Sequence, residues 1–490
     1  MRKYIINGAL AVFMLLFSQA CTDLSETTYD VIPTDQFGNT PEQQAALIGP
    51  LYTSLGDYFG RYAELNTTTD EQVIPTRGGD WGDGGAWRRL YLHTWEVVAD
   101  NGRFNGMWSW CYNSITSINL QLASVTDPAV QAELRALRAF YHYIAMDHFG
   151  NVIIADKIGG DSPVQKTRAE VFAWIESELL AVYDNLSDTA GGTYYGRFNK
   201  YVVDMFLAKM YLNAQVYTGQ PQWAKVVDYT SRVIDDKKYT LVSDFFSNFS
   251  VTNHNSTEII LATPFDKSKR TGMNIQRRTL HYLNQLTYNL SLSTWNGYCS
   301  LENFYNSFED HDLRKNMWLV GQQFNKDGTQ LFDDGLPLSY NPVIPSLEMP
   351  GGPVTRMAGV RSQKYEIQRN NTVGDQDNDF VIFRLSDAYM MRGEANYRLG
   401  KTAEAVEDIN IIRRRALVEE FTTLNDDILL AELGREFAWE YHRRQDLIRF
   451  GKFTAPKTFK ANTSPEYRTL FPIPKDQLDL NPNLRQNPGY

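Results

Sequence analysis

The sequence FRLSDAYMMRGEANYRLGKTAEAVEDINIIRRRALV occupies residues 383–418 and carries the clearest indication of architecture in the chain. Apolar residues recur there every three or four positions, which predicts one helix over 383–399 and another over 402–418. Gly400 interrupts the periodicity and permits a tight turn, and Thr402 is suited to cap the second helix. The stretch therefore predicts two helices joined by a short turn.

The same layout occurs elsewhere in the chain. Helical periodicity on both sides of a turn that contains Gly and Pro predicts a second pair at 199–236. Weaker candidates lie at 131–186 and in an early pair around 41–58 and 105–124. Small residues near the turns are typical of tetratricopeptide-like units, which are about 34 residues long and stack on their neighbours. The sequence therefore predicts a mainly α fold, with a tetratricopeptide-like scaffold of about four helix pairs.

Two long insertions separate these pairs, at about 60–100 and 240–380. Both are rich in Gly, Asn, Asp, Ser, Thr and Pro, with aromatic residues between them, which predicts a large irregular, loop-rich half. Few short strands are expected, at Glu258–Ala262 and Val381–Phe383. No Gly/Ser-rich or Pro-rich linker divides the chain, so residues 21–490 are predicted to form a single globular unit.

The N-terminus is typical of an export signal. A basic start, a short apolar run over 9–17 and small residues before Cys21 predict a lipoprotein signal peptide at residues 1–20. Cys21 is then the predicted lipidation site, and an ordinary secretory signal with an incidental cysteine is the alternative. Several acyl chains on one cysteine would anchor the protein durably. Only Cys111 and Cys299 remain, and the sequence does not predict whether they pair.

The composition limits the classes of function. The 490 residues carry a formal net charge of −10, and loss of Arg2 and Lys3 with the signal gives −12. This argues against nucleic acid as a partner, because phosphates require a basic face. The sequence has no His-Glu-x-x-His, no paired Cys-x-x-Cys, no Gly-x-Ser-x-Gly and no phosphate loop. No catalytic residue, metal site or cofactor is therefore predicted. Residues 375–386 lack the Gly and Glu of an EF-hand, which leaves a looser calcium site or a solvated turn there.

Several blocks, in a fixed order, resemble the SusD/RagB family. They are Arg138-Ala139-Phe140-Tyr141 with Phe149-Gly150-Asn151-Val152, Phe383 to Ala395, Asn410-x-x-Arg413-x-Arg415-Ala416, Arg435-Glu436 with Asp446 to Gly451, and Leu470 to Tyr490. Together with the predicted lipobox, the resemblance spans nearly the whole chain.

This resemblance implies a largely helical fold and a lipoprotein on the outer face of a Bacteroidetes outer membrane. It implies a SusC-like TonB-dependent transporter as partner and the capture of oligosaccharides without catalysis. The charged signature residues are expected to form internal ion pairs between helix pairs; they are Arg384, Arg413, Arg449, Glu394 and Glu436. Pro472 and Pro474 predict an extended tail that lies over the helices.

The candidate ligand site is drawn from the two insertions. Sugars present flat C–H faces and hydroxyl edges, which aromatic rings and polar side chains can hold. The predicted binding residues are Asp70, Arg77, Trp81, Trp87, Tyr288, Trp295 and Tyr298. Trp87 or Trp81 from one loop and Trp295 or Tyr298 from the other are expected to flank one shallow groove. The alternative is that these rings are local plugs beneath their loops.

Three other functions stay open. A peptide-binding import protein would need exposed backbone edges or a charged pocket. A glycoside hydrolase would need two carboxylates about 5–10 Å apart, and 58 acidic residues do not exclude such a pair. A purely structural lid would have no ligand selectivity of its own.

Overall fold

A computed structural model of the protein describes residues 41–159 and 163–490. The chain divides into two compact units, Met1–Leu47 and Ile48–Tyr490, and everything that follows concerns the second. Helix α2 (Pro41–Thr53) crosses the boundary between them. The predicted signal peptide and Cys21 lie outside the described residues.

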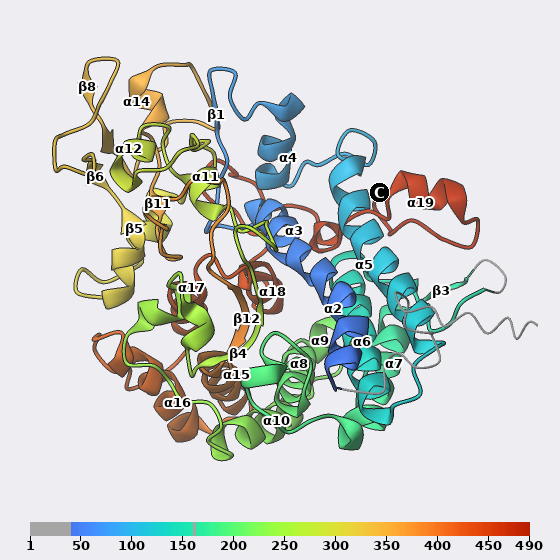
Figure 1. Ribbon diagram of the computed structural model, residues 1–490. Helices are drawn as coiled ribbons and strands as arrows, with labels where there is room; N and C mark the ends of the chain where they lie inside the picture. Colours follow the sequence, from blue (N-terminus) through green and yellow to red (C-terminus); the bar gives the residue numbers. More distant parts are fainter. Residues whose placement is uncertain (1–40, 160–162) are drawn as a thin grey trace, which may run out of the picture. The chain divides into compact units, whose positions relative to one another are not determined.

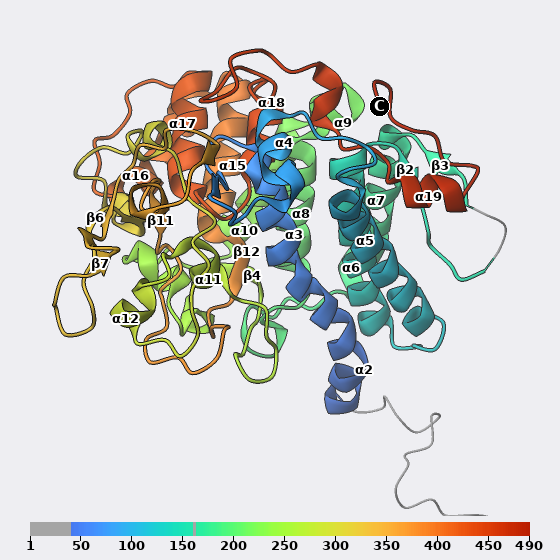
Figure 2. The same cartoon turned by 90° about the horizontal axis from the view of Figure 1, so that it is seen from above.

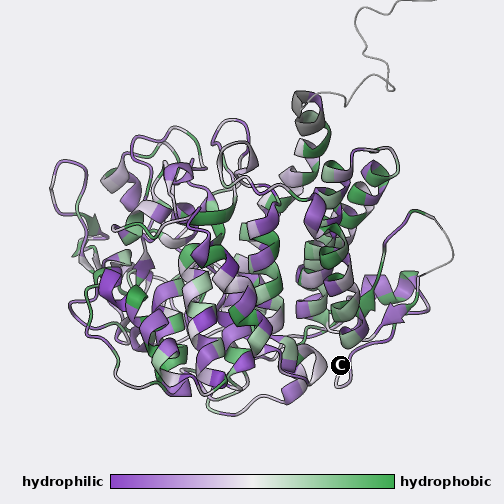
Figure 3. Ribbon diagram, turned by 90° about the horizontal axis from the view of Figure 1, so that it is seen from below, coloured by the Kyte–Doolittle hydropathy of each residue, from purple (hydrophilic) through white to green (hydrophobic). Residues whose placement is uncertain are grey.

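A row of antiparallel helices forms one half of the second unit. Its members are α5 (Asn101–Leu122), α6 (Pro128–Phe149), α7 (Arg168–Val182), α8 (Lys200–Leu212), α9 (Ala214–Thr218), α10 (Trp223–Asp235), α15 (Leu385–Arg398), α16 (Thr402–Arg415), α17 (Asp426–Phe437) and α18 (Arg443–Arg449). Along the row α5 packs on α6, α6 on α7, α8 on α10, α10 on α15, and α15 on α16 (Figures 1 and 2). Figure 3 shows apolar and polar residues interspersed along these helices. α10 is amphipathic and buries Val226, Tyr229 and Val233 on one face, whereas α8 is buried from Tyr201 to Leu212.

Local sequence signals fix where these helices begin. The Asp127 carboxylate accepts hydrogen bonds from two backbone N–H groups at the start of α6, and Pro128 occupies the first helical position. Thr167 and Glu170 form a capping box at α7. Asn199 caps α8 through the N–H of Val202. Each cap satisfies backbone donors that have no partner within the helix.

The predicted helix pairs at 199–236 and 383–418 are confirmed. Two details differ, because residues 383 and 384 belong to a strand and Thr402 is the first helical residue rather than the cap. The helix expected at 105–124 is α5, and its main helix partner is α6, so it does not form an early pair of its own.

The other half is irregular, as predicted, and its strands form only two-stranded sheets within the described ranges. The longest are β4 (Ile259–Thr263) and β12 (Phe380–Arg384), which pair antiparallel with Phe380 opposite Thr263 and confirm the two expected strands. The short strands of this half are β1 (Thr76–Arg77), β5 (Trp318–Leu319), β6 (Gly321–Gln322), β7 (Phe332–Asp333), β8 (Leu336–Pro337), β9 (Ser339–Tyr340), β10 (Glu348–Met349) and β11 (Arg361–Ser362). Short helices interrupt its loops; they are α3 (Asp57–Leu65), α4 (Ala86–Leu92), α11 (Ile275–Thr279), α12 (Asn284–Tyr288), α13 (Glu302–Tyr305) and α14 (Pro353–Arg356). The strand pair β2 (Val152–Ile153) and β3 (Gln165–Lys166) and the helix α19 (Lys475–Leu480) lie on the helical half instead, beside α5, α6 and α7 (Figure 1).

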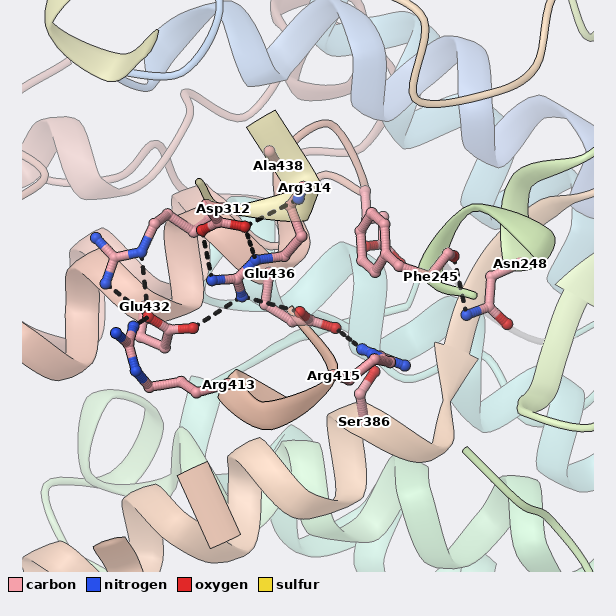
Figure 4. Close-up of polar contacts among 12 residues, drawn as sticks. Phe245, Asn248, Asp312, Arg314, Ser386, Arg413, Arg415, Glu432, Glu436 and Ala438 are labelled. Carbon is pink, nitrogen blue, oxygen red and sulfur yellow. Dashed lines mark hydrogen bonds and ion pairs between the residues drawn. The ribbon is translucent and has the colours of Figure 1, made fainter. Parts of the chain in front are cut away.

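Buried ion pairs connect the two halves. Arg314, from the irregular half, lies 2.8 Å from carboxylate oxygens of Asp312 and Glu432 and 3.1 Å from one of Glu436 (Figure 4). Arg384 pairs with Glu436 at 2.6 Å and is fully buried. Further along the row, Arg449 pairs with Glu394 at 2.6 Å. The expectation that the charged signature residues form internal ion pairs is therefore confirmed.

The C-terminal tail lies over α5 and α6. The Phe471 N–H donates to the carbonyl of His148 on α6 at 2.8 Å, and its ring lies 5.1 Å from that of Phe104 on α5. The Asn487 side chain donates to the carbonyls of Phe149 and Phe471 at 2.9 Å. These contacts confirm that the tail lies over the helices, but it is not extended throughout as predicted, because Lys475–Leu480 form a short helix that packs on α5.

Candidate functional site

The two loops that carry the predicted binding aromatics meet in the structure. Trp81 lies between β1 and α4, and its ring centroid is 5.9 Å from that of Trp87 and 5.5 Å from that of Tyr298. The rings of Trp87 and Tyr298 are 6.0 Å apart, in an edge-on arrangement that aromatic pairs favour. The Trp81 indole N–H donates to the carbonyl of Trp295 at 2.7 Å. We name these four residues the aromatic cluster.

Trp81 is held in a conformation that costs energy. Its φ of 57° is in the left-handed region, which costs a residue with a Cβ about 1–2 kcal/mol. Its ring lies directly against the backbone of Gly297, where an added Cβ would be only 2.3 Å from the indole. The hydrogen bond to Trp295 and this close contact offset the strain. The ring is therefore fixed in place, as binding surfaces built on loops require.

The four rings differ in how much of them reaches solvent. Trp87 is 5% exposed and Tyr298 is 1% exposed, whereas Trp81 and Trp295 are only partly buried. The guanidinium of Arg103 covers the Trp87 ring at 3.8 Å, and Arg278 donates to the Tyr298 hydroxyl at 2.9 Å. Trp87 and Tyr298 thus form the base of the cluster, and Trp81 and Trp295 form its accessible rim.

The other three predicted binding residues already have partners inside the protein. Asp70 forms a two-bond ion pair with Arg443 at 2.7 and 2.8 Å, and this outweighs burial and lowers the pKa of Asp70. Arg77 is 3% exposed and donates to main-chain carbonyls, among them that of Asn296 at 2.8 Å. It therefore braces the loop that carries Trp295.

Tyr288 is not part of the aromatic cluster. It is buried on α12 and lines a separate hollow of about 600 Å³ between residues 244–250 and 363–369. The Arg369 guanidinium covers its ring at 4.9 Å. The structure thus brings together four of the seven predicted residues and places Asp70, Arg77 and Tyr288 in other contacts.

Polar side chains surround the rim of the cluster. The Tyr282 hydroxyl donates to the Asp80 carboxylate, and burial and this bond raise the pKa of Tyr282 to about 12. The guanidinium of Arg277 lies 4.3 Å from the Trp295 ring centroid. Flat rings with donors and acceptors at their edges are the chemistry that holds a sugar ring by its faces and its hydroxyls.

An open groove of about 510 Å³ lies beside α3, and Arg278 in its lining connects it to the cluster. It is lined by Thr53, Gly56, Asp57, Phe59, Gly60, Arg61, Glu64, Lys269, Arg270, Thr271, Gly272, Asn274 and Arg278. Arg278 bonds to Tyr298 of the cluster, and Glu64 pairs at 3.4 Å with the arginine that covers Trp87. A second hollow of about 440 Å³ shares Asp57 and Arg61 with the groove.

Sequence reasoning missed the charged residues of this groove. Arg61 and Glu64 are single charges on an amphipathic helix, and Arg278 lies in a short helix without a motif. No local pattern distinguishes them from solvated surface charges, and only the packing of α3 beside residues 269–278 identifies them.

Metal-binding clusters and membrane-spanning helices are absent from the described ranges. Within residues 41–159 and 163–490, no group of three or more His, Cys, Asp or Glu side chains is arranged to hold a metal ion. No helix in the same ranges is long and apolar enough to cross a membrane. Cys111 and Cys299 are both buried and unpaired with each other.

The chain is similar to known proteins over its whole length. Residues 43–212 match the family described as "Starch-binding associating with outer membrane", and residues 350–490 match the SusD family. The starch-binding protein SusD of Bacteroides thetaiotaomicron is 27% identical, over 100% of this chain and 99% of its own length. A SusD-like protein of Bacteroides ovatus is 23% identical, over 91% of this chain and 83% of its length.

Solved structures agree on the fold. A SusD superfamily protein from Parabacteroides distasonis superposes with a TM-score of 0.75 at 20% identity, covering 92% of this chain and all of that one. Surface glycan-binding protein A from Bacteroides thetaiotaomicron, in complex with laminarihexaose, gives a TM-score of 0.74 at 20% identity and covers 91% and 99%. With both family matches and a relative aligned over its whole length, the chain belongs to the SusD/RagB family.

Proposed function

We propose that this protein captures oligosaccharides at the cell surface and delivers them to a SusC-like TonB-dependent transporter, without making or breaking bonds. A lipid on Cys21 would hold it on the outer face of the outer membrane. The relatives named above as binding starch, or solved with laminarihexaose, support a glycan as ligand. The observation that carries the proposal is the rim formed by Trp81 and Trp295, in a cluster that Arg278 links to an open groove.

The rim suits a sugar for physical reasons. A pyranose ring that rests on an indole replaces water on two apolar faces, and the rigid loop loses little conformational freedom when it binds. Asp80, Tyr282 and Arg277 supply hydrogen-bonding groups beside the rings. A shallow, partly polar surface of this kind fits a ligand that is bound and then released.

The test removes the two rim rings together. In full-length protein purified in detergent, Trp81→Ala with Trp295→Ala is expected to weaken binding at least about 100-fold, or about tenfold for each ring lost. Binding is measured by calorimetry on a glycan panel that includes maltohexaose and laminarihexaose. Trp223→Ala, which removes a partly exposed ring at the start of α10, is the matched control and should leave affinity unchanged.

Other outcomes would decide against the proposal. A folded double variant that still binds the same glycan with wild-type affinity would contradict the site. Collapse of the melting temperature would show that the rings are plugs. Reducing-sugar release by the wild-type protein would favour a hydrolase, and peptide binding that survives the double replacement would favour a peptide carrier.

A further inference from the structure

We propose that the glycan is acidic, and that the groove beside the aromatic cluster binds its carboxylate or sulfate groups with Arg61 as the central contact. This inference rests on the proposed glycan-binding function and deepens it by naming the class of ligand.

The charge of the groove is opposite to that of the chain. Four basic side chains line it (Arg61, Lys269, Arg270 and Arg278), against two acidic ones (Asp57 and Glu64). The chain as a whole has 48 basic and 58 acidic residues. A basic hollow in an acidic protein does not follow from composition, and concave surfaces concentrate the field of their charges. The groove is therefore a local site of attraction for anions.

Arg61 has no partner in the part of the chain that the structure describes. Its guanidinium forms no hydrogen bond and no ion pair there, whereas Arg103 nearby pairs with Glu64 at 3.4 Å. Arg61 extends from α3 across the face of α5, where it lies against Gly106; an added Cβ there would be 2.4 Å from a guanidinium nitrogen. Packing thus positions this cation, and its five donors have no acceptor among residues 41–159 and 163–490.

Arg61 also faces both hollows, since it lines the groove of about 510 Å³ and the adjoining one of about 440 Å³. A planar guanidinium with free N–H groups matches the two oxygens of a carboxylate or two oxygens of a sulfate ester. The asparagine and serine side chains along α5 offer neutral hydrogen bonds around it; they are Asn105, Ser109, Asn113 and Ser117.

The two neighbouring arginines keep their charge unneutralised. Arg278 donates to Asn274 at 2.7 Å and to Tyr298 at 2.9 Å, and both acceptors are uncharged. Arg270 donates to the carbonyl of Tyr52, and its Nε is buried without an acceptor among the described residues. Neither forms an ion pair in those ranges, so either guanidinium can pair directly with an anionic ligand.

Arg278 connects the anion site to the stacking rim. It lines the groove and bonds to Tyr298, whose ring contacts Trp81 at 5.5 Å. One sugar of a chain can therefore rest on the rim while the acidic group of a neighbouring sugar meets the arginines.

The experiment compares glycans that differ only in charge. Full-length protein in detergent is titrated with hexagalacturonate and its methyl ester, and with sulfated and unsulfated laminarihexaose, so that the two arms separate carboxylate from sulfate. At low salt, the acidic member of at least one pair is expected to bind about tenfold more tightly than the neutral member, because charge-assisted hydrogen bonds to the arginines strengthen its binding. The preference should shrink at 0.5 M salt.

Arg61→Gln is expected to reduce the preference for the acidic member by about tenfold while affinity for the neutral member stays constant. Arg414→Gln removes the same charge from the exposed surface of α16, away from α3 in both views, and should change nothing (Figures 1 and 2). Equal affinity for both members of each pair, or a preference that survives Arg61→Gln, overturns the inference. If neutral glycans bind through Trp81 and Trp295 without any acidic preference, only this inference fails; if no glycan binds, the proposed function fails with it.

Discussion

Glu436, on α17, is a completely buried carboxylate that contacts three guanidinium groups. It lies 2.6 Å from Arg384. Figure 4 shows its contacts with Arg314, at 3.1 Å, and with Arg415. Burial alone would raise the pKa of Glu436, but these arginines outweigh it and hold that pKa well below its usual range. The carboxylate is therefore charged at neutral pH. The three arginines compensate its buried charge, and it compensates theirs.

Replacing this carboxylate tests the dependence. Glu436→Gln should lower the free energy of unfolding by about 3–5 kcal/mol, because it leaves buried guanidinium charge uncompensated. Glu407→Gln removes an exposed carboxylate that pairs with Arg414, and should cost less than about 1 kcal/mol. Urea unfolding of both variants measures the difference. Similar small losses in the two would show that the buried network contributes little.

The helix pairs could be predicted from sequence because their signal is local. In α15 and α16 the apolar spacing and Gly400 are enough to indicate two helices and a turn. The meeting of the Trp81 and Trp295 loops could be expected from their shared composition. The burial of Trp87 could not, because it depends on the arginine that covers it from α5. That Arg61 has no partner among the described residues also depends on how separate elements pack, which no local pattern records.

α15 and α16 approach each other closely at Gly393, a position that the apolar periodicity of the sequence does not mark as a helix contact. A Cβ on Gly393 would lie 2.8 Å from Ile409 of the facing helix. Gly393→Ala should therefore lower the free energy of unfolding by about 1–3 kcal/mol despite the better helix propensity of Ala. Gly102→Ala on α5 meets no atom within 4 Å and should stabilise by up to about 1 kcal/mol. Thermal unfolding compares them, and stabilisation by both would contradict the tight contact.

Several histidines in different parts of the protein are buried, and burial keeps them neutral. Burial lowers the pKa of His93 to about 2 and those of His142, His148 and His281 to about 4. Paired buried carboxylates such as Glu432 are also lowered, to about 2. Five acids behave in the opposite way, since burial raises the pKa of Glu71 to about 8, those of Asp204 and Asp387 to about 7, and those of Asp379 and Asp408 above their usual value.

These shifts have defined signs. A histidine whose folded pKa is lowered takes up its proton on unfolding, so its stabilisation is lost as pH falls below about 6.5. Carboxylates with a lowered pKa lose their stabilising contribution as pH falls below about 4.5. The acids with raised pKa retain protons in the folded state and oppose this trend between about pH 4.5 and 7. The histidines with lowered pKa, which include His442, are equal in number to these acids, so stability should change little between pH 6.5 and 4.5 and fall steeply below 4.5, where the carboxylates with lowered pKa take up protons.

His142 offers a direct test of this balance. Its Nδ1–H donates to the carbonyl of Arg138 at 2.9 Å, and its Nε2 accepts from the N–H of Ala155 at 3.0 Å, so both ring nitrogens are used by the neutral form. A proton on Nε2 would face the Ala155 N–H and break that bond. His142→Gln should remove about 1.4 kcal/mol per pH unit from the slope of unfolding free energy between pH 6.5 and 4.5. His311→Gln, at an exposed position, should leave the slope unchanged. Urea unfolding at half-unit steps of pH measures both slopes, and equal slopes in wild type and His142→Gln would show that this buried imidazole does not contribute to the acid sensitivity.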